Sequence, residues 1–575
     1  MENTELVRIF GEIAEFLELK QDNPFKIRAY QKAARTIEAL SQNLADIYKA
    51  GGLPALKELP GIGHDLAEKI ESYIKTGKIK TYQELKKEFP KGFLDLLAIP
   101  SLGPKTAMLL YKKFKIDSVK KLEMFIKSGR LKGIPGFGEK KATNLSQGIE
   151  LKKKVKGRFL LSEALAYAEP ITQELKKIKE IGQLLPAGSL RRRQETIGDL
   201  DFLVTSKKPA KVMAAFTSLP QVERTLVKGE TKASVILKNG MQADLRVVPD
   251  ISFGAAAHYF TGSKGHNIYI RQLAQKKGWK VSEYGIFNAA GKQIGGRTEA
   301  EMFSKFGLQF IPPELREMRG EFEAAAKGEI PKLIELADIR GDLQMHSKHS
   351  DGANTLEELA AAAKKLGYEY IAVTDHTQST RIAGGQSVKE FLKELEEIDK
   401  LNAKLKGFRI LKGVEIDILP DGTLDYPDSV LKEVEVVIAA VHSNFKMEKS
   451  KMTRRINKAL ENKYVNILSH PTGRIIGKRD PYEIEIEAIF KTAKETGTFM
   501  ELNAYPERLD LKDTHCQRAK ELGLELAIDT DSHAATQLVN MKYGVMTARR
   551  GWLEKSDVIN TLPANKLLKK LMRKR

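Results

Sequence analysis

The sequence predicts a multidomain protein in which helical domains come first, an α+β domain follows, and a distorted (β/α) barrel ends the chain. Three observations support this order. A Pro-x-x-Gly turn followed by an amphipathic helix occurs three times between residues 59 and 145. Two aspartates alternate with apolar residues at 198–204, as in a half-buried strand. From residue 339 short apolar strands alternate with helices. At 575 residues the chain is also too long for one hydrophobic core.

Composition and charge favour a protein that binds a polyanion. The net charge is +21, and residues 101–300 hold 37 Lys and Arg against 17 Asp and Glu. Such a local excess of cations is typical of nucleic-acid binding, and a solvated basic surface without a partner is the alternative. The single cysteine, Cys516, excludes an internal disulfide framework. No apolar run approaches the ~18 residues of a membrane span. We therefore expect a cytoplasmic protein with no membrane partner.

The three repeated segments are LPGIGHDLAEKI (59–70), IPSLGPKTAMLL (99–110) and IPGFGEKKATNL (134–145). Proline ends the preceding element, and glycine permits the positive φ of a tight turn. The free N–H groups of the turn and of the helix N-terminus can then hold one phosphate without reading a base. The pattern resembles the helix-hairpin-helix motif of DNA-binding enzymes, and a purely structural role is the alternative for the third copy. The candidate DNA-binding residues are Gly61, Gly63, Gly103, Lys105, Gly136 and Gly138.

Two aspartates in GDLDFLV predict a metal site on one face of a strand. Asp199 and Asp201 project to the same face, because side chains two apart in a strand point the same way. Like charges side by side are unfavourable unless cations neutralise them, and a pair of divalent metals does so. A third carboxylate is expected on a neighbouring strand, and Asp244 in MQADLRVVP offers it. The alternative is an exposed strand edge.

The residues before this strand can hold a triphosphate. Gly188 and Ser189 begin a turn that enters a helix, and Arg192 follows them. Backbone N–H groups, the Ser189 hydroxyl and the Arg192 guanidinium are suitable donors to phosphate oxygens.

Together these motifs resemble a family X DNA polymerase, of the bacterial type that carries a second catalytic domain. The resemblance implies that Asp199, Asp201 and Asp244 are the catalytic, Mg²⁺-binding triad of a nucleotidyltransferase palm. It implies that the incoming nucleotide contacts Gly188, Ser189, Arg192, Gly198, Tyr259, Phe260, Gly262 and Asn267. Arg271 matches a contact to the template strand. For Tyr259 and Phe260, a role as core aromatics is the alternative.

The resemblance also implies a lyase in the N-terminal helical domain. Lys69 matches the lysine that forms a Schiff base with an abasic sugar, and Lys26 and Tyr30 match positions that line its pocket. Two residues depart from the pattern of the animal members. Asp65 stands in place of a phosphate-binding lysine, and Phe25 in place of a histidine. An acid near a 5′-phosphate repels it, so a solvated helix lysine is the alternative for Lys69.

The third region has potential metal ligands at the ends of successive strands. Seven of the ten histidines lie beyond residue 340, and a (β/α) barrel places its chemistry at the C-terminal ends of its strands. The pattern resembles the polymerase and histidinol phosphatase (PHP) domain, whose ligands map onto His346, Asp351, His376, Glu415, His442, His470, Asp531 and His533. Gln344 replaces a usual histidine, and because glutamine is a poorer ligand we expect one metal to bind weakly, with assistance from Asp342 as the alternative. Mixed nitrogen and carboxylate ligands suit a multinuclear Mn²⁺ or Zn²⁺ site.

The combined prediction is a DNA polymerase for gap-filling repair joined to a metal-dependent 3′–5′ exonuclease, with abasic-site endonuclease action as a further option. The expected partners are gapped or primer–template DNA and dNTP, and the expected state is a monomer in the cytoplasm, associated with the nucleoid. The rivals are a noncatalytic DNA-end bridging protein and a nucleotidyltransferase acting on RNA or a small molecule. The expected parts are a lyase-like helical domain (1–80), a second helical domain (81–155), the palm (156–250), a C-terminal polymerase subdomain (251–315), a linker (316–338) and the PHP barrel (339–575).

Overall fold

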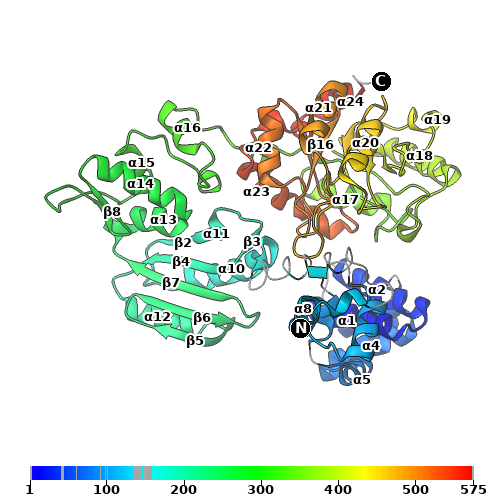
Figure 1. Cartoon of the computed structure of the whole chain (residues 1–575), viewed down its shortest axis with the longest axis horizontal. Helices are drawn as coiled ribbons and strands as arrows, with labels where there is room; N and C mark the ends of the chain where they lie inside the picture. The colour runs from blue at the N-terminus through cyan, green and yellow to red at the C-terminus, as the bar shows by residue number, and fades with distance from the viewer. Residues whose placement is uncertain are drawn as a thin grey trace.

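A computed structural model describes residues 3–572 apart from 40–43, 60, 91, 98, 100–101, 134–141, 143–144, 147–148 and 150–157. The third repeated turn, with the predicted DNA contacts Gly136 and Gly138, lies outside the described residues. The chain forms helices first, then a mixed sheet with its helices, and then a parallel barrel (Figure 1).

The N-terminal part is helical. Its elements are α1 (Asn3–Lys20), α2 (Pro24–Ala39), α3 (Leu44–Lys57), α4 (His64–Thr76), α5 (Lys80–Glu88), α6 (Leu94–Leu97), α7 (Pro104–Phe114), α8 (Val119–Lys127) and η1 (Arg130–Gly133). Both predicted helical domains contribute to one cluster of buried side chains, which runs from Leu6 to Ile149. The two sequence segments therefore share a hydrophobic core.

A five-stranded mixed sheet forms the centre of the polymerase-like part. Its order is β2 (Leu184–Pro186), β4 (Asp199–Thr205), β7 (Gln242–Val248), β6 (Lys232–Leu237) and β5 (Val222–Lys228). Only the β4–β7 pair is parallel. Helices α10 (Leu161–Lys176) and α12 (Pro209–Thr217) pack on the sheet, and the short pair β1 (Phe159–Leu160) and β3 (Thr196–Ile197) precedes β4. Leu200, Phe202 and Val204 are buried in this core, as the alternation in β4 predicts.

A mixed helical and β subdomain follows the sheet. Its elements are η2 (Asp250–Ser252), α13 (Phe253–Thr261), α14 (Lys264–Lys276), β8 (Lys280–Ser282), β9 (Gly285–Phe287), β10 (Gln293–Gly295), α15 (Glu299–Ser304), η3 (Pro313–Leu315) and α16 (Glu321–Lys327). The segment expected as a linker contributes to the core of this subdomain. Arg316 is fully buried and binds Glu299, and Phe322 packs on Phe303 and Ile311.

The C-terminal part is a barrel of parallel strands. The strands are β11 (Gly341–Asp342), β12 (Tyr370–Val373), β13 (Arg409–Asp417), β14 (Val436–Ala440), β15 (Ile467–Leu468), β16 (Phe499–Asn503) and β17 (Leu526–Asp529), hydrogen-bonded in that order. The helices around them are α17 (Leu356–Lys365), α18 (Val388–Asn402), α19 (Asp428–Leu431), α20 (Lys449–Leu460), α21 (Ile486–Thr496), α22 (Asp513–Glu521), α23 (Met541–Arg550) and α24 (Ala564–Leu571), with shorter turns at η4 (Leu336–Asp338), η5 (Arg381–Ala383), η6 (Ala535–Asn540), η7 (Lys555–Asp557) and η8 (Ile559–Thr561).

The first and last strands of the barrel approach each other through their loops. The His346 amide donates to the Ser532 carbonyl over 2.8 Å, and the Leu343 amide donates to the Asp529 carboxylate over 3.0 Å. The barrel is therefore nearly closed, which agrees with the predicted fold class. Its strands end on one side, and the loops after them carry the polar residues.

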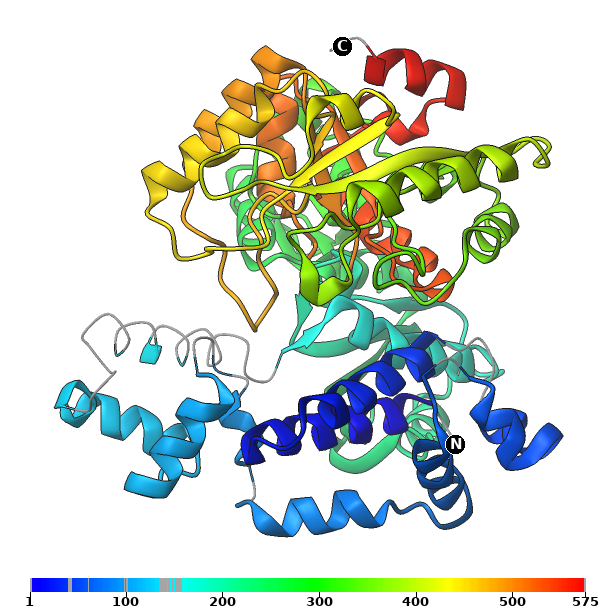
Figure 2. The ribbon, with the colours of Figure 1, turned by 90° about the vertical axis from the view of Figure 1, so that its right-hand side faces the viewer.

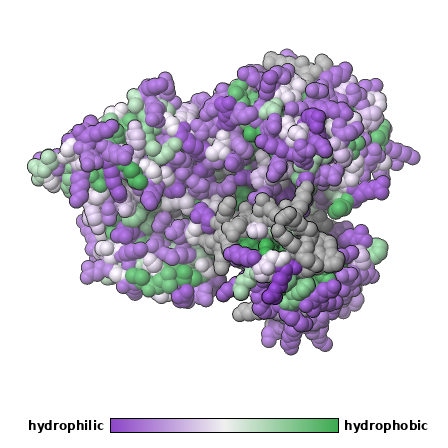
Figure 3. Space-filling model, viewed as in Figure 1, coloured by the Kyte–Doolittle hydropathy of each residue, from purple (hydrophilic) through white to green (hydrophobic). Residues whose placement is uncertain are grey.

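The three parts of the molecule contact one another. The N-terminal helices lie beside the barrel in both views (Figures 1 and 2), and α2 contacts η6 of the barrel. The face in Figure 3 is largely hydrophilic, with small separate apolar patches. Among the described residues no helix is both long enough and apolar enough to cross a bilayer.

Candidate active sites

The three acidic residues predicted from the palm motif lie together on two paired strands. In the parallel register of β4 and β7, Asp201 lies opposite Asp244 and Asp199 opposite Gln242. The side chains of Asp199, Asp201 and Asp244 therefore face the same side of the sheet. Lys232, on the next strand, lies with its Nζ 3.1 Å from Asp244 Oδ2.

The electrostatics of this cluster favour bound cations. Burial, followed by the neighbouring charges of Asp199 and Asp244, raises the pKa of Asp201 to about 7. Burial and Asp244 also raise the pKa of Asp199. The repulsion between these carboxylates is offset only in part by the nearby cations Lys232, Arg192 and Arg158, since the pKa values of both aspartates remain raised. Divalent cations would remove this repulsion. The donor set, all carboxylate oxygens, fits Mg²⁺.

The turn before β4 places backbone against the acidic cluster. Gly188 has φ +61°, and a Cβ there would lie 2.2 Å from Asp201 Oδ2, so only glycine fits. The Ala187 amide donates to the Asp201 carbonyl over 2.8 Å. Helix α11 (Gly188–Arg191) follows at once and carries Ser189. The predicted triphosphate residues thus lie directly beside the predicted metal ligands.

Arg192 is held by two acceptors outside this turn. Its Nε donates to Glu317 Oε1 over 2.9 Å, and its Nη1 donates to the Thr261 carbonyl over 2.5 Å. Gly198 directly precedes β4, and a Cβ there would lie 3.3 Å from the Arg158 guanidinium. Gly198 is therefore adjacent to Asp199, and Arg192 is close enough to Asp201 to offset part of the rise in the pKa of that carboxyl group.

The second nucleotide motif lies at the junction of α13 and α14. Tyr259 and Phe260 are partly exposed and stack edge to face, with their ring centroids 5.1 Å apart. Arg271 lies over the Tyr259 ring. Asn267 donates to the Tyr259 carbonyl over 2.7 Å. Phe260 also borders the cavity that contains Asp201 and Asp244, which brings this motif to the acidic cluster.

The helix-hairpin-helix glycines differ in conformation, and this corrects one prediction. Gly61 has φ +75°, as predicted, but Gly63 and Gly103 have negative φ and form the N-caps of α4 and α7. A Cβ at Gly63 or Gly103 would meet no atom within 4 Å. Neither cap has a side chain that satisfies the free N–H groups of its helix. Glycine there leaves the N–H groups open to a phosphate, and Lys105 is exposed beside them.

The lysine of the predicted lyase site has an acidic partner. Lys69 Nζ forms an ion pair with Asp65, one turn earlier on α4. Lys26 is exposed at the start of α2, and Tyr30 is only 1% exposed, with its ring against Phe10. Lys69 thus pairs with Asp65, the residue expected to depart from the phosphate-binding lysine of the animal members.

All eight predicted ligands of the barrel lie in one cluster at the strand ends. Glu415, at the end of β13 and 1% exposed, lies at its centre. Four imidazoles approach its oxygens: His470 at 3.1 Å, His376 and His442 at 3.2 Å, and His346 at 3.4 Å. These four histidines come from four different loops, which only the barrel brings together.

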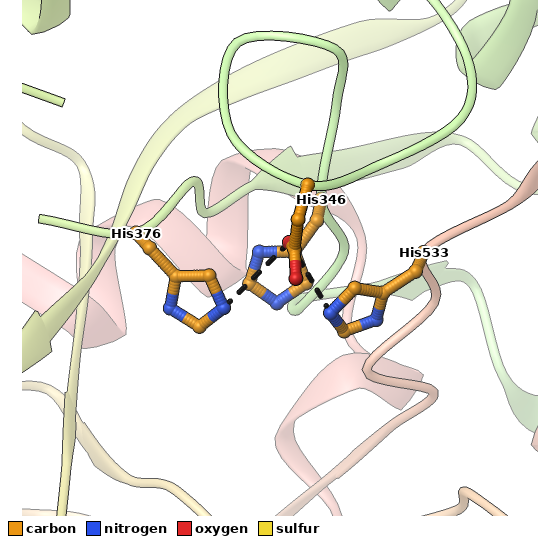
Figure 4. Close-up of side chains that lie close together, drawn as sticks. His346, His376 and His533 are labelled. Atoms are coloured by element: carbon orange, nitrogen blue, oxygen red, sulfur yellow. Dashed lines mark ion pairs between the residues drawn. The ribbon is translucent and has the colours of Figure 1, made fainter. Parts of the chain in front are cut away.

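The remaining predicted ligands, Asp351, Asp531 and His533, lie next to His346 and His376. His346 Nε2 lies 3.2 Å from Asp531 Oδ1, and His533 Nε2 lies 3.4 Å from Asp351 Oδ1. His346, His376 and His533 point toward one another (Figure 4), with the His346 ring 4.3 Å from each neighbouring ring. Three groups of ligand atoms are compact enough to hold an ion: one around Asp351, one around Glu415 and His442, and one around Glu415 and Asp531.

The donor chemistry of this cluster fits metal ions. Buried atoms without a hydrogen-bond partner include Asp351 Oδ1, Glu415 Oε2 and the Nδ1 atoms of His346 and His470. Burial opposes charge on His442, yet Glu415 and Asp417 raise its pKa to about 10. A mixed set of imidazole nitrogens and carboxylate oxygens is suited to Mn²⁺ or Zn²⁺. Asp417 accepts from His442 Nδ1 over 2.8 Å and so orients that ring.

Sequence reasoning missed three residues near the cluster, Ser469, Glu501 and Arg508. Gln344, expected to weaken one metal, is fully buried, and Ser469 donates to its Oε1 over 2.9 Å. The same hydroxyl lies 2.9 Å from Glu501 Oε2, which competes with Gln344 for its one proton, and Glu501 is a second buried acid behind the cluster. Arg508 Nε lies 3.6 Å from Asp531 Oδ2, and its buried Nη1 has no hydrogen-bond partner. Arg508 lies in a loop that contains no recognisable motif, so the sequence around it did not indicate a functional role.

Comparison with known proteins matches each part of the chain. Family models match residues 1–79 (helix-hairpin-helix domain), 93–152 (SAM-like helix-hairpin-helix tandem), 256–317 (DNA polymerase beta thumb) and 342–505 (PHP domain). The "DNA polymerase/3'-5' exonuclease PolX" of Bacillus subtilis is 41% identical over 563 residues, which is 97% of each chain. A probable phosphatase of Thermoanaerobacter sp. (strain X514) is 31% identical over 235 residues, 38% of this chain and 89% of its own length.

These matches and the fold define a class, the family X DNA polymerases that carry a C-terminal PHP domain. The chain belongs to this family, in common with PolX of Bacillus subtilis, to which nearly its whole length is similar. The family predicted from the sequence is therefore confirmed, and so are the helical hairpins and the barrel. Both catalytic parts of such proteins are metal-dependent, and the barrel holds His, Asp and Glu groups compact enough for an ion.

Proposed function

We propose that this chain is a DNA-directed DNA polymerase that fills short gaps during repair, and that its barrel is a metal-dependent 3′–5′ exonuclease. One observation carries the proposal. The chain holds two separate acidic clusters, one on β4 and β7 beside Ser189 and Arg192, and one around Glu415 in the barrel. The similarity to PolX over 97% of both chains supports the pairing of these two activities.

In the palm, the residues of the chain position the reacting groups. Ser189, the turn at Gly188 and Arg192 bind the triphosphate of the dNTP through N–H, hydroxyl and guanidinium donors. Asp199, Asp201 and Asp244 hold two Mg²⁺ ions, which, when bound, neutralise the phosphate charge and lower the pKa of the primer 3′-hydroxyl. Asp244 lies beside that hydroxyl. Gly198 also contacts the triphosphate. The incoming sugar and base are surrounded by Tyr259, Phe260, Gly262 and Asn267, and Arg271 contacts the template.

In the barrel, the eight ligands hold Mn²⁺ or Zn²⁺, which, when bound, supplies an activated water for attack on a phosphodiester. Glu415 contacts four imidazoles and belongs to two of the three groups that could hold an ion, so it would contribute to both. Arg508, with an unpaired N–H beside Asp531, binds a non-bridging oxygen of the 3′-terminal phosphate. Asp531 pairs with the Nε edge of this guanidinium, and its buried Nη1 has no hydrogen-bond partner among the described residues.

The parts of the chain divide this work. The helical hairpins, with free N–H groups at Gly63 and Gly103, bind the backbone of gapped or primer–template DNA without sequence preference. The palm and the subdomain after it add nucleotides, and the barrel removes them from 3′ ends. We propose that the chain works as a monomer associated with the nucleoid.

A second activity of the barrel is removal of 3′-terminal phosphate groups. The probable phosphatases that match the PHP region over 89% of the Thermoanaerobacter chain favour it. With a metal bound, the same ligands would direct a water at either ester, because the leaving group is a 3′-oxygen in both and the monoester differs only in having a free, charged oxygen where the diester carries a nucleoside.

A labelled primer in a gapped duplex tests the main proposal. With dNTPs and Mg²⁺ we expect extension by the nucleotide complementary to the template, favoured at least about tenfold over a mismatch. Without dNTPs and with Mn²⁺ we expect shortening from the 3′ end. Binding without extension under either metal would favour a DNA-end bridging protein. Template-independent addition would favour a different nucleotidyltransferase.

The Lys69–Asp65 pair predicts weak lyase activity. The carboxylate of Asp65 pairs with Lys69 Nζ and repels a 5′-phosphate, so approach of the abasic sugar to this nitrogen is disfavoured. Asp65→Asn should increase borohydride-trapped adduct with a 5′-deoxyribose phosphate end about two- to fivefold. Lys69→Ala should remove the adduct. If Asp65→Asn leaves trapping unchanged, the ion pair does not limit the reaction. If Lys69→Ala still traps, another lysine is the nucleophile.

A further inference from the structure

A group of ion pairs connects the barrel to the triphosphate-binding turn of the palm. Arg550 ends helix α23 of the barrel, and its Nη1 donates to the backbone carbonyl of Arg192 over 2.6 Å. The same Nη1 lies 3.1 Å from Glu317 Oε1, the oxygen that accepts from Arg192 Nε. Arg550 therefore contacts Arg192 twice, once directly and once through Glu317.

We infer that Arg550 of the nuclease barrel is a positioning residue for nucleotide addition, acting on the dNTP through Arg192. The inference rests on the proposed function, because it requires Arg192 to bind the triphosphate. It goes beyond that function because it makes a residue of the nuclease part necessary for nucleotide affinity in the polymerase part.

Helix α11 needs support from outside because it has only four residues. The last carbonyls of a helix lack partners within it, and a four-residue helix has almost no internal hydrogen bonds to hold them in place. Arg193, directly after Arg192, has φ +56°, an unfavourable conformation for a residue with a side chain. The hydrogen bond from Arg550 to the Arg192 carbonyl stabilises the chain at this point.

Glu317 then sets the direction of the Arg192 side chain. Its Oε1 accepts from Arg192 Nε over 2.9 Å, from Gln194 Nε2 over 2.5 Å and from Arg550 Nη1 over 3.1 Å. Three donors on one oxygen leave the carboxylate little freedom to turn. A guanidinium binds phosphate well only when its planar N–H groups are aligned, so a loosened Arg192 would bind the triphosphate less tightly.

Arg550 is itself held rigidly by the barrel. Its Nη2 donates to Asp513 Oδ2 over 2.7 Å, and Arg319 Nη2 shares that oxygen at 3.0 Å. Arg319 Nη2 also donates to the Arg550 carbonyl over 3.1 Å. The Arg550 side chain is 6% exposed. A guanidinium buried this deeply keeps its place only while its charged partners are present.

Single-nucleotide insertion into gapped DNA tests the inference. Arg550→Met should raise the KM for dNTP about tenfold, because it removes hydrogen bonds to a charged group and to a carbonyl. We expect kcat to change less than about threefold, and the Kd for gapped DNA and the exonuclease rate to stay at wild-type values. Arg550→Lys keeps the charge but cannot reach all three acceptors, so its KM should be intermediate.

Arg549→Met is the matched control. Arg549, the preceding residue, pairs with Glu314 at 2.8 Å in the same contact between barrel and polymerase, and it makes no hydrogen bond to Arg192 or Glu317. Its KM for dNTP should stay within about twofold of wild type. An equal rise in both variants would mean that the contact acts only by holding the two parts together, and would overturn the inference.

Arg192→Lys separates this inference from the proposed function. It should raise the KM for dNTP, and adding Arg550→Met to it should raise the KM no further, since both act on one guanidinium. An unchanged KM in Arg192→Lys overturns the triphosphate role and the inference with it. A raised KM in Arg192→Lys with a wild-type KM in Arg550→Met overturns only the inference. Wild-type exonuclease rates in every variant show that the barrel is folded.

Discussion

The double substitution Asp199→Ala and Asp201→Ala should abolish template-directed synthesis, by at least about 10³-fold, and leave 3′–5′ degradation unchanged. The two residues supply two of three carboxylates in the palm cluster, and metal-assisted catalysis contributes several kcal/mol to phosphoryl transfer. Extension and degradation of one labelled gapped duplex measure both activities. Asp250→Ala, an exposed acid just beyond β7, is the control and should keep full synthesis.

This double variant should not be less stable than the wild type. Burial and neighbouring charges raise the pKa of Asp201 to about 7, so the cluster costs folding free energy when no cation is bound. Its removal relieves that repulsion, and the thermal midpoint without metal should stay equal or rise. Synthesis above about one per cent of the wild-type rate would contradict the assignment of the triad.

Glu415→Gln should have the opposite effect, with loss of exonuclease activity by at least about 10²-fold and unchanged synthesis. Glu415 is buried and contacts four imidazoles, so one substitution weakens two of the three candidate ion positions. Glutamine keeps the side-chain volume of glutamate but removes its negative charge. It also replaces one carboxylate oxygen with an amide NH₂ group, which cannot coordinate a metal ion. His346→Ala and His442→Ala should behave in the same way.

In Glu415→Gln the number of metal ions bound per protein chain should fall together with the exonuclease rate. Elemental analysis measures the bound metal. Glu397→Gln is the control, because Glu397 also pairs with a histidine of the barrel, His349 at 3.2 Å, but lies outside the cluster. If Glu415→Gln keeps both its metal and its exonuclease rate, Glu415 is not a shared ligand. If synthesis is lost as well with the fold intact, the division of labour between the two parts is wrong.

Local sequence patterns predicted much of the fold. The alternation of Asp199 and Asp201 with Leu200, Phe202 and Val204 follows from the two-residue period of a strand, and the structure buries the three apolar residues. The barrel followed from the same kind of pattern, because parallel strands all end on one side and collect the polar residues after them. Ligands such as His346 and His470 could therefore be grouped without knowledge of the contacts.

Contacts between distant segments could not be predicted in this way. The pairing of Asp201 with Asp244 depends on the register of β4 against β7, with the β5–β6 hairpin between them in sequence. Gly63 and Gly103 were expected to have positive φ, but their role as helix N-caps depends on the angle at which each turn enters its helix. The hydrogen bond from Arg550 to Arg192 joins the barrel to the palm, and no local sequence pattern predicts it.

The central claim is that three carboxylates of the palm hold two metal ions beside the triphosphate. Anomalous scattering from Mn²⁺ in crystals with gapped DNA and a non-hydrolysable dNTP tests it most directly. We predict two peaks about 3.5–4 Å apart, ligated by Asp199, Asp201 and Asp244 and by phosphate oxygens. Peaks only in the barrel, with the nucleotide bound away from these carboxylates, would contradict the account.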